Sequence, residues 1–420
     1  MSQEQMIQTH EMKGVEETTC CIVGGGPAGM MLALLLARQG IAVTLLEAHM
    51  DFDRDFRGDT IHPAVMEILD EIGLASRLLQ LKHTEARQFV LQTTTGNAAV
   101  DLSRLKTKYP YITIISQARF LDFIAEEARQ YTTFKLVMGA QVNELIEEGG
   151  AVRGVRYHGQ DGWYEVRAAL TVGADGRFSR VRKLAGFEPV ATSTPMDVLW
   201  FRLSRQEGDP NEGAGGRFTT RRIVVLINRL DYWQVGYVIP KGGYQEIRAA
   251  GLEVFRQALA QTLPFFANRV DELKEWKQIA VLSVESSRVP RWHRKGLLVI
   301  GDAAHVMSPI GGVGINYAIQ DAVATANILS GKLKAKTVQE SDLAKVQQER
   351  ELPTRVIQRV QVLLQDQIFA KAMKAAPDAP FTFPPFIGWM LSIPFVRTLL
   401  ARLIAFGLRP AHVQVTQKGQ

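Results

Sequence analysis

The sequence is poor in the residues that crosslink small proteins or hold metal ions. Only two cysteines occur in 420 residues, adjacent at Cys20 and Cys21, and eight scattered histidines form no H-E-x-x-H pattern. A disulfide framework needs more cysteines, and zinc sites need clustered ligands. We therefore expect no metal site, and we expect two buried thiols in a reducing compartment.

Strong charge of one sign and long hydrophobic runs are also lacking. The net charge is +6, from 49 basic and 43 acidic residues spread along the chain, so no nucleic-acid partner is expected. No run of 18 or more uncharged apolar residues occurs, and residues 1–18 lack the pattern of a signal peptide. We expect a cytoplasmic protein with a flexible N-terminus at residues 1–18.

The first positive signal is a glycine-rich turn between an apolar strand, residues 20–23, and a helix, residues 28–39. Its G-x-G-x-x-G pattern is completed by Gly24, Gly26 and Gly29. These glycines permit a tight turn, close approach of a pyrophosphate and close packing of the helix on the strand. Glu47 ends the next strand and is placed to accept hydrogen bonds from a ribose. The motif alone fits FAD and NAD equally.

Two later segments carry further ligand-binding signals. Residues 170–176 form a strand that ends in Asp175-Gly176, and residues 297–305 form another that ends in Gly301-Asp302. The second continues through Pro309 to a glycine-rich loop, residues 311–316, before a helical run. In α/β folds, ligands bind at the carboxyl ends of parallel strands, so these turns are expected at the same site.

With these segments in this order, the sequence resembles the class A flavoprotein monooxygenases, such as p-hydroxybenzoate hydroxylase and the ubiquinone-pathway hydroxylases. The GGGPAG, GADG and GDAAH…P…GGVGIN segments match over about residues 19–330. The resemblance implies an α/β fold, in which a Rossmann-like FAD-binding domain is interleaved with a mixed-sheet substrate domain and followed by a C-terminal helical tail.

The resemblance also implies which residues hold FAD. The first segment would bind the ADP half, Asp302 the ribitol, and Pro309 with residues 311–316 the isoalloxazine ring. Arg57 and Gln117 match family contacts to the phosphate and ribityl groups, with Arg119 as the alternative to Gln117. The full set is Gly24, Gly26, Pro27, Ala28, Gly29, Glu47, Arg57, Gln117, Asp175, Gly301, Asp302, Pro309, Gly312, Gly314, Ile315 and Asn316.

The domain boundaries follow from where the fingerprints stop. The FAD-binding domain is expected at residues 19–77, 112–190 and 286–330, and the substrate domain at 78–111 and 191–285. The substrate domain contains strand-like runs, and the resemblance implies that they form a sheet over the flavin. Candidate pocket residues are Trp200, Arg202, Gln234 and Tyr237 from this sheet, with Pro309 and Ile310.

Residues 331–420 are expected to be helical. A helix is predicted over 351–374, beginning near Pro353, and a proline-rich break follows it. Residues 386–408 are apolar and contain Arg397 and Arg402, Arg409 follows directly, and no acidic residue occurs after residue 378. This composition is typical of a helix that lies on a membrane, here through residues 386–410, on the inner face. The alternative is a helix packed on the protein's own surface or at a homodimer contact.

The resemblance implies a monooxygenase that consumes NADH or NADPH. Reduced FAD would take up O₂ as a C4a-hydroperoxide and hydroxylate or epoxidise an aromatic, quinone-like or otherwise electron-rich hydrophobic substrate. No catalytic side chain is identified, and His305 is expected to be structural. Two alternatives remain: an FAD-dependent reductase of prenyl double bonds, related to geranylgeranyl reductase, and a non-enzymatic FAD-binding interaction protein.

Overall fold

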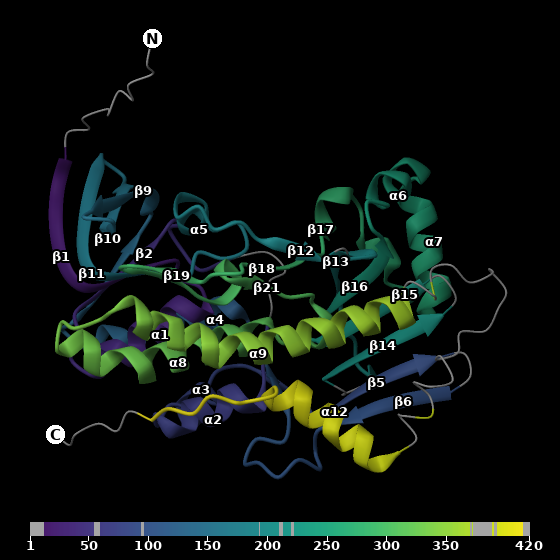
Figure 1. The fold of residues 1–420 in the computed structure, drawn as a ribbon. Coiled ribbons are helices and arrows are strands. Elements are labelled where there is room, and N and C mark those ends of the chain that lie inside the picture. The colour runs from purple at the N-terminus through teal and green to yellow at the C-terminus, as the bar shows by residue number, and fades with distance from the viewer. Residues whose placement is uncertain are drawn as a thin grey trace.

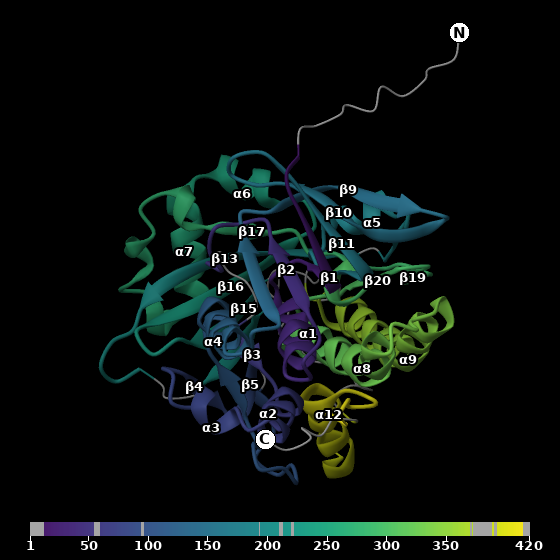
Figure 2. The same ribbon diagram turned by 90° about the vertical axis from the view of Figure 1, so that its left-hand side faces the viewer.

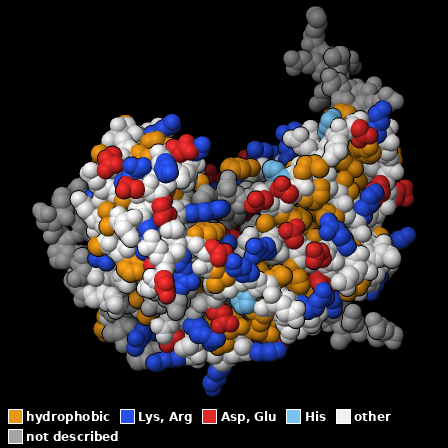
Figure 3. Space-filling view, turned by 180° about the vertical axis from the view of Figure 1, so that it is seen from behind, with side chains coloured by type: hydrophobic (Ala, Val, Ile, Leu, Met, Phe, Trp, Pro, Cys, Tyr) orange, Lys and Arg blue, Asp and Glu red, His pale blue; other side chains and the backbone are white. Residues whose placement is uncertain are grey.

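The computed structural model describes residues 12–53, 59–93, 96–192, 194–209, 213–219, 222–369, 372, 389 and 393–414. Arg57 and most of residues 370–392 lie outside these ranges. Two large sheets stand side by side, with long helices across one side (Figure 1). From behind, the surface is hollowed between the lobe of β9–β11 and the lobe of α6 and α7, and charged side chains surround the hollow (Figure 3).

The first sheet has eight strands and a parallel centre in the order β20-β11-β1-β2-β8. β9, β10 and β19 add antiparallel neighbours. Its strands are β1 (Met12–Val23), β2 (Val43–Glu47), β8 (Phe134–Met138), β9 (Gln141–Glu148), β10 (Ala151–His158), β11 (Trp163–Gly173), β19 (His293–Arg294) and β20 (Leu297–Val299). The carboxyl half of β1 and all of β2 are buried and mostly apolar, and the helix at residues 27–37 packs on β1, β2 and β8.

The second sheet has seven strands in the order β17-β13-β16-β15-β14-β5-β6. They are β5 (Gln88–Thr93), β6 (Gly96–Asp101), β13 (Met196–Ser204), β14 (Ala214–Thr219), β15 (Arg222–Asn228), β16 (Tyr232–Pro240) and β17 (Ala280–Leu282). Two small sheets connect the large ones: β3 (Thr60–Ile61), β4 (Thr84–Ala86) and β7 (Ile112–Ile114), and β12 (Val190–Thr192), β18 (Ser286–Arg288) and β21 (His305–Val306).

The helices take their places from their apolar faces. α1 is buried along nearly its whole length, and it packs against α4 and α8, which in turn packs against α9. The helices are α1 (Pro27–Ala37), α2 (Pro63–Glu71), α3 (Ala75–Leu78), α4 (Gln117–Arg129), α5 (Arg180–Leu184), α6 (Tyr244–Ala250), α7 (Leu252–Thr262), α8 (Gly314–Lys334), α9 (Glu340–Leu364) and α12 (Pro394–Phe406).

Two predicted boundaries were wrong. β1 begins at Met12, so residues 12–18 are strand and not a flexible terminus. They pair with the long strand β11 although their side chains are mostly polar, which hid them from a hydrophobicity pattern. The helix predicted to begin near Pro353 begins at Glu340, where Gln339 and Asp342 form a capping box, and Pro353 lies inside it. A proline usually marks a helix start, but here buried packing on α8 outweighs its lost hydrogen bond.

Candidate functional site

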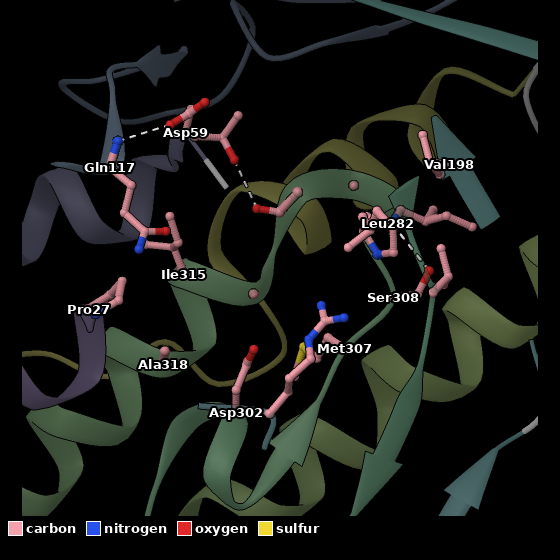
Figure 4. A pocket seen from close by; sticks show the side chains of 18 of the residues that line it. Pro27, Asp59, Gln117, Val198, Leu282, Asp302, Met307, Ser308, Ile315 and Ala318 are labelled. Atoms are coloured by element: carbon pink, nitrogen blue, oxygen red, sulfur yellow. Dashed lines mark hydrogen bonds between the residues drawn. The ribbon is translucent and has the colours of Figure 1, made fainter. Parts of the chain in front are cut away.

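A large cavity lies where the carboxyl ends of β1 and β11 meet the second sheet. Its volume is about 1570 Å³. Ligand pockets usually measure about 300–1,000 Å³, so the space holds more than one small molecule. Figure 4 shows part of the lining: Pro27, Ile315 and Ala318 lie on one side, Val198, Leu282 and Ser308 lie on the other, and Asp302 and Met307 lie between them.

The three glycines of the first fingerprint meet different structural constraints. Gly24 has a φ of +106°, and a Cβ there would lie 2.4 Å from the Ala174 carbonyl oxygen. A Cβ at Gly29 would lie 2.0 Å from the Gly24 carbonyl oxygen, so this glycine packs against the turn behind the cavity wall. A Cβ at Gly26 would meet nothing within 4 Å, because Gly26 faces the open cavity.

The first turn of α1 fits a dinucleotide phosphate. No side chain caps this helix end, so its backbone N–H groups face the cavity beside Gly26 without a capping acceptor. Such N–H groups, with the helix dipole behind them, form an anion site. FAD carries a diphosphate, so the residues present fit the group that the fingerprint implies.

Two predicted cofactor contacts, Glu47 and Asp175, line the cavity and also hold the loops around it. The Glu47 carboxylate accepts hydrogen bonds from the Gly25 N–H at 2.7 Å and the His49 N–H at 3.0 Å. Asp175 accepts from the Ser179 hydroxyl at 2.5 Å and from two backbone N–H groups at the start of α5. Burial raises the pKa of Asp175, and these hydrogen bonds oppose that shift only in part.

A buried ionic network fixes the turn that carries Asp302. Asp321 accepts a hydrogen bond from the Gly301 N–H at 3.0 Å, contacts His305 Nε2 at 2.6 Å and pairs with Arg350 Nε at 3.0 Å. Burial alone would raise the pKa of Asp321, but His305 and Arg350 outweigh it and lower that pKa. His305 therefore acts through Asp321 on the backbone, as a structural residue.

The 309–316 loop forms the next part of the wall. Gly311 and Gly312 have φ values of 79° and 63°, and Thr60 Oγ donates to the Gly312 carbonyl at 3.0 Å. α8 begins here with no side-chain cap. Asn316, which we expected to contact the cofactor, is fully buried behind the wall, where its Oδ1 accepts a hydrogen bond from Gln320 Nε2 at 3.0 Å.

The predicted cofactor residues converge on this one cavity, with four exceptions. Gly29, Gly301 and Asn316 lie behind the wall, and Arg57 lies outside the described residues. Arg119 points into a second, smaller cavity and not into this one, which favours Gln117 as the contact. The residues that line the cavity are Gly24, Gly26, Pro27, Ala28, Glu47, Gln117, Asp175, Asp302, Pro309, Gly312, Gly314 and Ile315.

The second sheet presents one face to the cavity, and the alternation of side chains decides which candidates reach it. Trp200 and Gln234 line the cavity with Pro309 and Ile310, whereas Arg202 lines the smaller cavity beside Gln234. Tyr237 was a wrong choice. It lies an odd number of residues after Gln234, so it points to the opposite face, where its ring packs on Phe255 of α7.

The tail supplies cavity residues that the sequence analysis missed. Residues of α12 and of a π-helical turn, Gln365–Phe369, close the apolar end of the cavity; among them are Leu400, Leu403, Ile404, Ile368 and Phe369. The Ile404 carbonyl lies 2.8 Å from His62 Nδ1, which ties α12 to the start of α2. The apolar periodicity of residues 394–406 was visible, but its partner was not.

Two kinds of site are absent from the part of the chain that the structure describes. No group of three or more His, Cys, Asp or Glu side chains within it is arranged to hold a metal ion. Among the same residues, no helix has both the length and the apolar character needed to cross a membrane.

Comparisons with known proteins identify the family of the chain. A family model for an FAD binding domain matches residues 17–360. The chain is 36% identical to 6-methylpretetramide 4-monooxygenase of Streptomyces rimosus over 84% of this chain and 85% of that one. Pentachlorophenol 4-monooxygenase of Sphingobium chlorophenolicum is 27% identical over 70% of this chain and 55% of its own length.

The chain is a class A flavin monooxygenase. It belongs to the FAD-binding family and acts as an FAD-dependent aromatic monooxygenase. The fold agrees: the anhydrotetracycline hydroxylase from Streptomyces rimosus superimposes with a TM-score of 0.72 at 24% identity, over 93% of this chain and 76% of that one. This family assignment supersedes the reductase and interaction-protein alternatives.

Proposed function

We propose that this monooxygenase uses NADH or NADPH as its reductant and hydroxylates a large, flat aromatic substrate. The observation that carries the proposal is the apolar end of the cavity, which lies beyond the 309–316 loop. Aliphatic and aromatic side chains from the second sheet, the π-helical turn and α12 surround it; they include Phe89, Leu91, Val198, Trp200, Val225, Ile227, Leu282, Phe369, Leu400 and Leu403.

The roles of the chain's residues follow from their positions. Bound FAD supplies the oxygen-activating chemistry. Gly26 and the first turn of α1 bind its diphosphate, Asp302 its ribitol, and the 309–316 loop borders its ring. The apolar walls exclude water from the reacting centre and orient the substrate ring by contact area. In this assignment, residues 78–111 and 191–285 contribute the substrate wall to an FAD-binding body made of 19–77, 112–190 and 286–330.

Relatives narrow the substrate class. The names of two of them give 6-methylpretetramide and anhydrotetracycline as substrates, and the tetracycline skeleton contains several fused rings. A cavity of about 1570 Å³ has room for such a ring system beside FAD. A panel of phenols, naphthols and larger polyketide-like phenols, scored by stimulated NAD(P)H oxidation, O₂ uptake and a product mass gain of one oxygen, tests the proposal. NAD(P)H oxidation without an oxygenated product from any compound refutes it.

We further propose that the outer face of α12 contacts an anionic lipid surface. Phe395 is 74% exposed and Leu399 is 55% exposed, and Leu399 and Arg397 also border the cavity. Arg397, Arg402 and Arg409 are exposed, and no acidic residue follows residue 378. Arginines at headgroups with apolar side chains below them are typical of an interfacial helix. Since α12 also lines the cavity, an apolar substrate dissolved in such a lipid surface would enter the cavity directly beside this helix.

A further inference from the structure

A second cavity of about 240 Å³ lies against the first, where the start of α4, the residues before β4 and the β15–β16 turn come together. These elements lie side by side in Figure 2. Its lining is polar and basic: Lys82, Arg119, Arg202 and Arg229 outnumber Asp53, Asp59 and Asp231. Among the described residues that line it, four cations and three acids give a formal charge of +1. We call it the arginine chamber.

Two of the three acids that line the arginine chamber, Asp59 and Asp231, form ion pairs with its cations. Asp59 lies 3.0 Å from Arg229 Nη and accepts a hydrogen bond from the Gln117 N–H at 2.9 Å. Asp231 pairs with Lys82 at 2.6 Å. Arg119 has no ion-pair partner among the described residues. Positive charge is therefore the surplus that a ligand in this chamber would meet.

The chamber and the main cavity share three wall residues, Asp59, Ile114 and Gln234. Gln234 is only 5% exposed, and it lines both cavities at the place where they meet. A side-chain amide that borders a cavity can donate a hydrogen bond and accept one, so this position suits a ligand with a polar group. Gln234 also stands opposite Arg202 in the β13–β16 register, so the amide and the guanidinium lie on one face.

The turn that carries Arg229 is built under strain. Leu230 has a φ of 71°, which is rare for a residue with a branched side chain. Its N–H donates to Asn228 Oδ1 at 2.9 Å, and its carbonyl accepts from Arg205 at 3.4 Å. Such conformations persist where the surrounding structure holds them, and here they fix the position of a chamber arginine.

We propose that the two cavities form one amphiphilic substrate site. The aromatic body of the substrate lies in the main cavity, and an anionic group on its far end, a carboxylate or an acidic enol, passes Gln234 and binds Arg202 and Arg119 in the arginine chamber. This inference rests on the proposed function, and it adds the charge of the substrate. Arginine suits it because its planar donors match a carboxylate in pairs.

Matched probes separate the two parts of the site. Binding of 2-naphthol, 6-hydroxy-2-naphthoic acid and the corresponding neutral amide is measured by perturbation of the flavin absorbance in the FAD-loaded enzyme. The wild-type enzyme is expected to bind the acid about tenfold more tightly than 2-naphthol, from one charge-assisted contact. The affinity for the amide should be close to the affinity for 2-naphthol. Equal affinity for acid and naphthol overturns the inference.

Variants then locate the preference. Arg202→Met should abolish the preference for the acid over 2-naphthol, and Arg202→Lys should keep part of it. Gln234→Leu should lower the affinity for the acid and for the amide alike. Tyr237→Phe, on the opposite face of the same strand, is the control and should keep the full preference. FAD content verifies that each variant is folded. An unchanged acid preference in Arg202→Met overturns the inference.

Two further outcomes separate a failure of this inference from a failure of the proposed function. If Arg202→Met and Arg119→Met raise the KM for NAD(P)H and leave the affinity for the acid unchanged, the chamber holds the reductant's phosphates; the inference then fails, and the proposed function stands. If no aromatic probe stimulates NAD(P)H oxidation in the wild-type enzyme, the proposed function fails, and this inference fails with it.

Discussion

His62 makes the attachment of α12 sensitive to pH. It is fully buried at the start of α2, and its Nδ1 lies 2.8 Å from the Ile404 carbonyl. A carbonyl only accepts, so Nδ1 carries the proton and donates it. Burial lowers the pKa of His62 from 6.5 to about 4, and the nearby Ile404 and Gly312 carbonyls oppose this only in part. The folded protein therefore keeps the ring neutral.

The sign of the effect follows from proton linkage. Between pH 6.5 and about 4, His62 binds a proton in the unfolded chain but stays neutral in the folded chain. The contribution of His62 to the free energy of unfolding is therefore complete above pH 6.5 and is lost as the pH falls toward 4. At about 1.4 kcal/mol for each unit of pKa difference, the free energy of unfolding should fall by about 2 kcal/mol at pH 5 and about 3 kcal/mol at pH 4.

The assay is urea unfolding of the FAD-loaded protein between pH 4 and 7.5. His62→Gln retains a donor for the Ile404 carbonyl but does not titrate, so its stability curve should be flatter than that of the wild type by the amounts above. His158→Gln removes an exposed histidine and should leave the wild-type curve unchanged. Parallel curves for wild type and His62→Gln across this range would refute the reasoning.

Four further outcomes are expected. Gly26→Val should fold but lose bound FAD, seen as lost flavin absorbance, whereas Gly29→Val should fail to fold because its Cβ would meet the Gly24 carbonyl at 2.0 Å. Asp302→Ala should lower the affinity for FAD by about tenfold to a hundredfold in a titration, because one charge-assisted hydrogen bond is lost. Arg350→Met leaves Asp321 buried without this partner and should cost about 3–5 kcal/mol in urea unfolding. Arg397→Glu with Arg402→Glu should reduce sedimentation with anionic vesicles at low salt while FAD stays bound; wild-type protein that never sediments would mean that α12 serves only as a cavity wall or a dimer contact.

The sequence was sufficient wherever the structural requirement is local. The strand–turn–helix around Gly24, Gly26 and Gly29 is specified by a few consecutive residues, because only glycine allows the positive φ and the close backbone contacts found there. The Gly301-Asp302 turn is of the same kind. The family resemblance that three such segments carry in their order along the chain implied the fold class and FAD, and the general position of ligands at strand ends implied the place of the cavity.

Where side chains had to be assigned to a face, the sequence was insufficient without strict attention to register. Trp200, Gln234 and Tyr237 are all plausible residues for an aromatic pocket, but a strand turns alternate side chains to opposite faces. Tyr237 consequently packs on Phe255, while Gln234 faces the ligand space. The pairing of β1 with β11 over residues 12–18 was likewise not visible, since it depends on backbone hydrogen bonds to a strand about 150 residues away.

Contacts between distant segments were decided by the tertiary structure alone. Nothing near Asp321 in the sequence indicates that His305 and Arg350 will share its carboxylate, and nothing near Ile404 indicates His62. The apolar stripe of α12 indicated that one face of this helix is buried. It did not indicate whether lipid, a second subunit or the enzyme's own cavity covers that face. Burial is a property of two surfaces, and one chain segment encodes only one of them; the fold brought the inner face of α12 to the cavity.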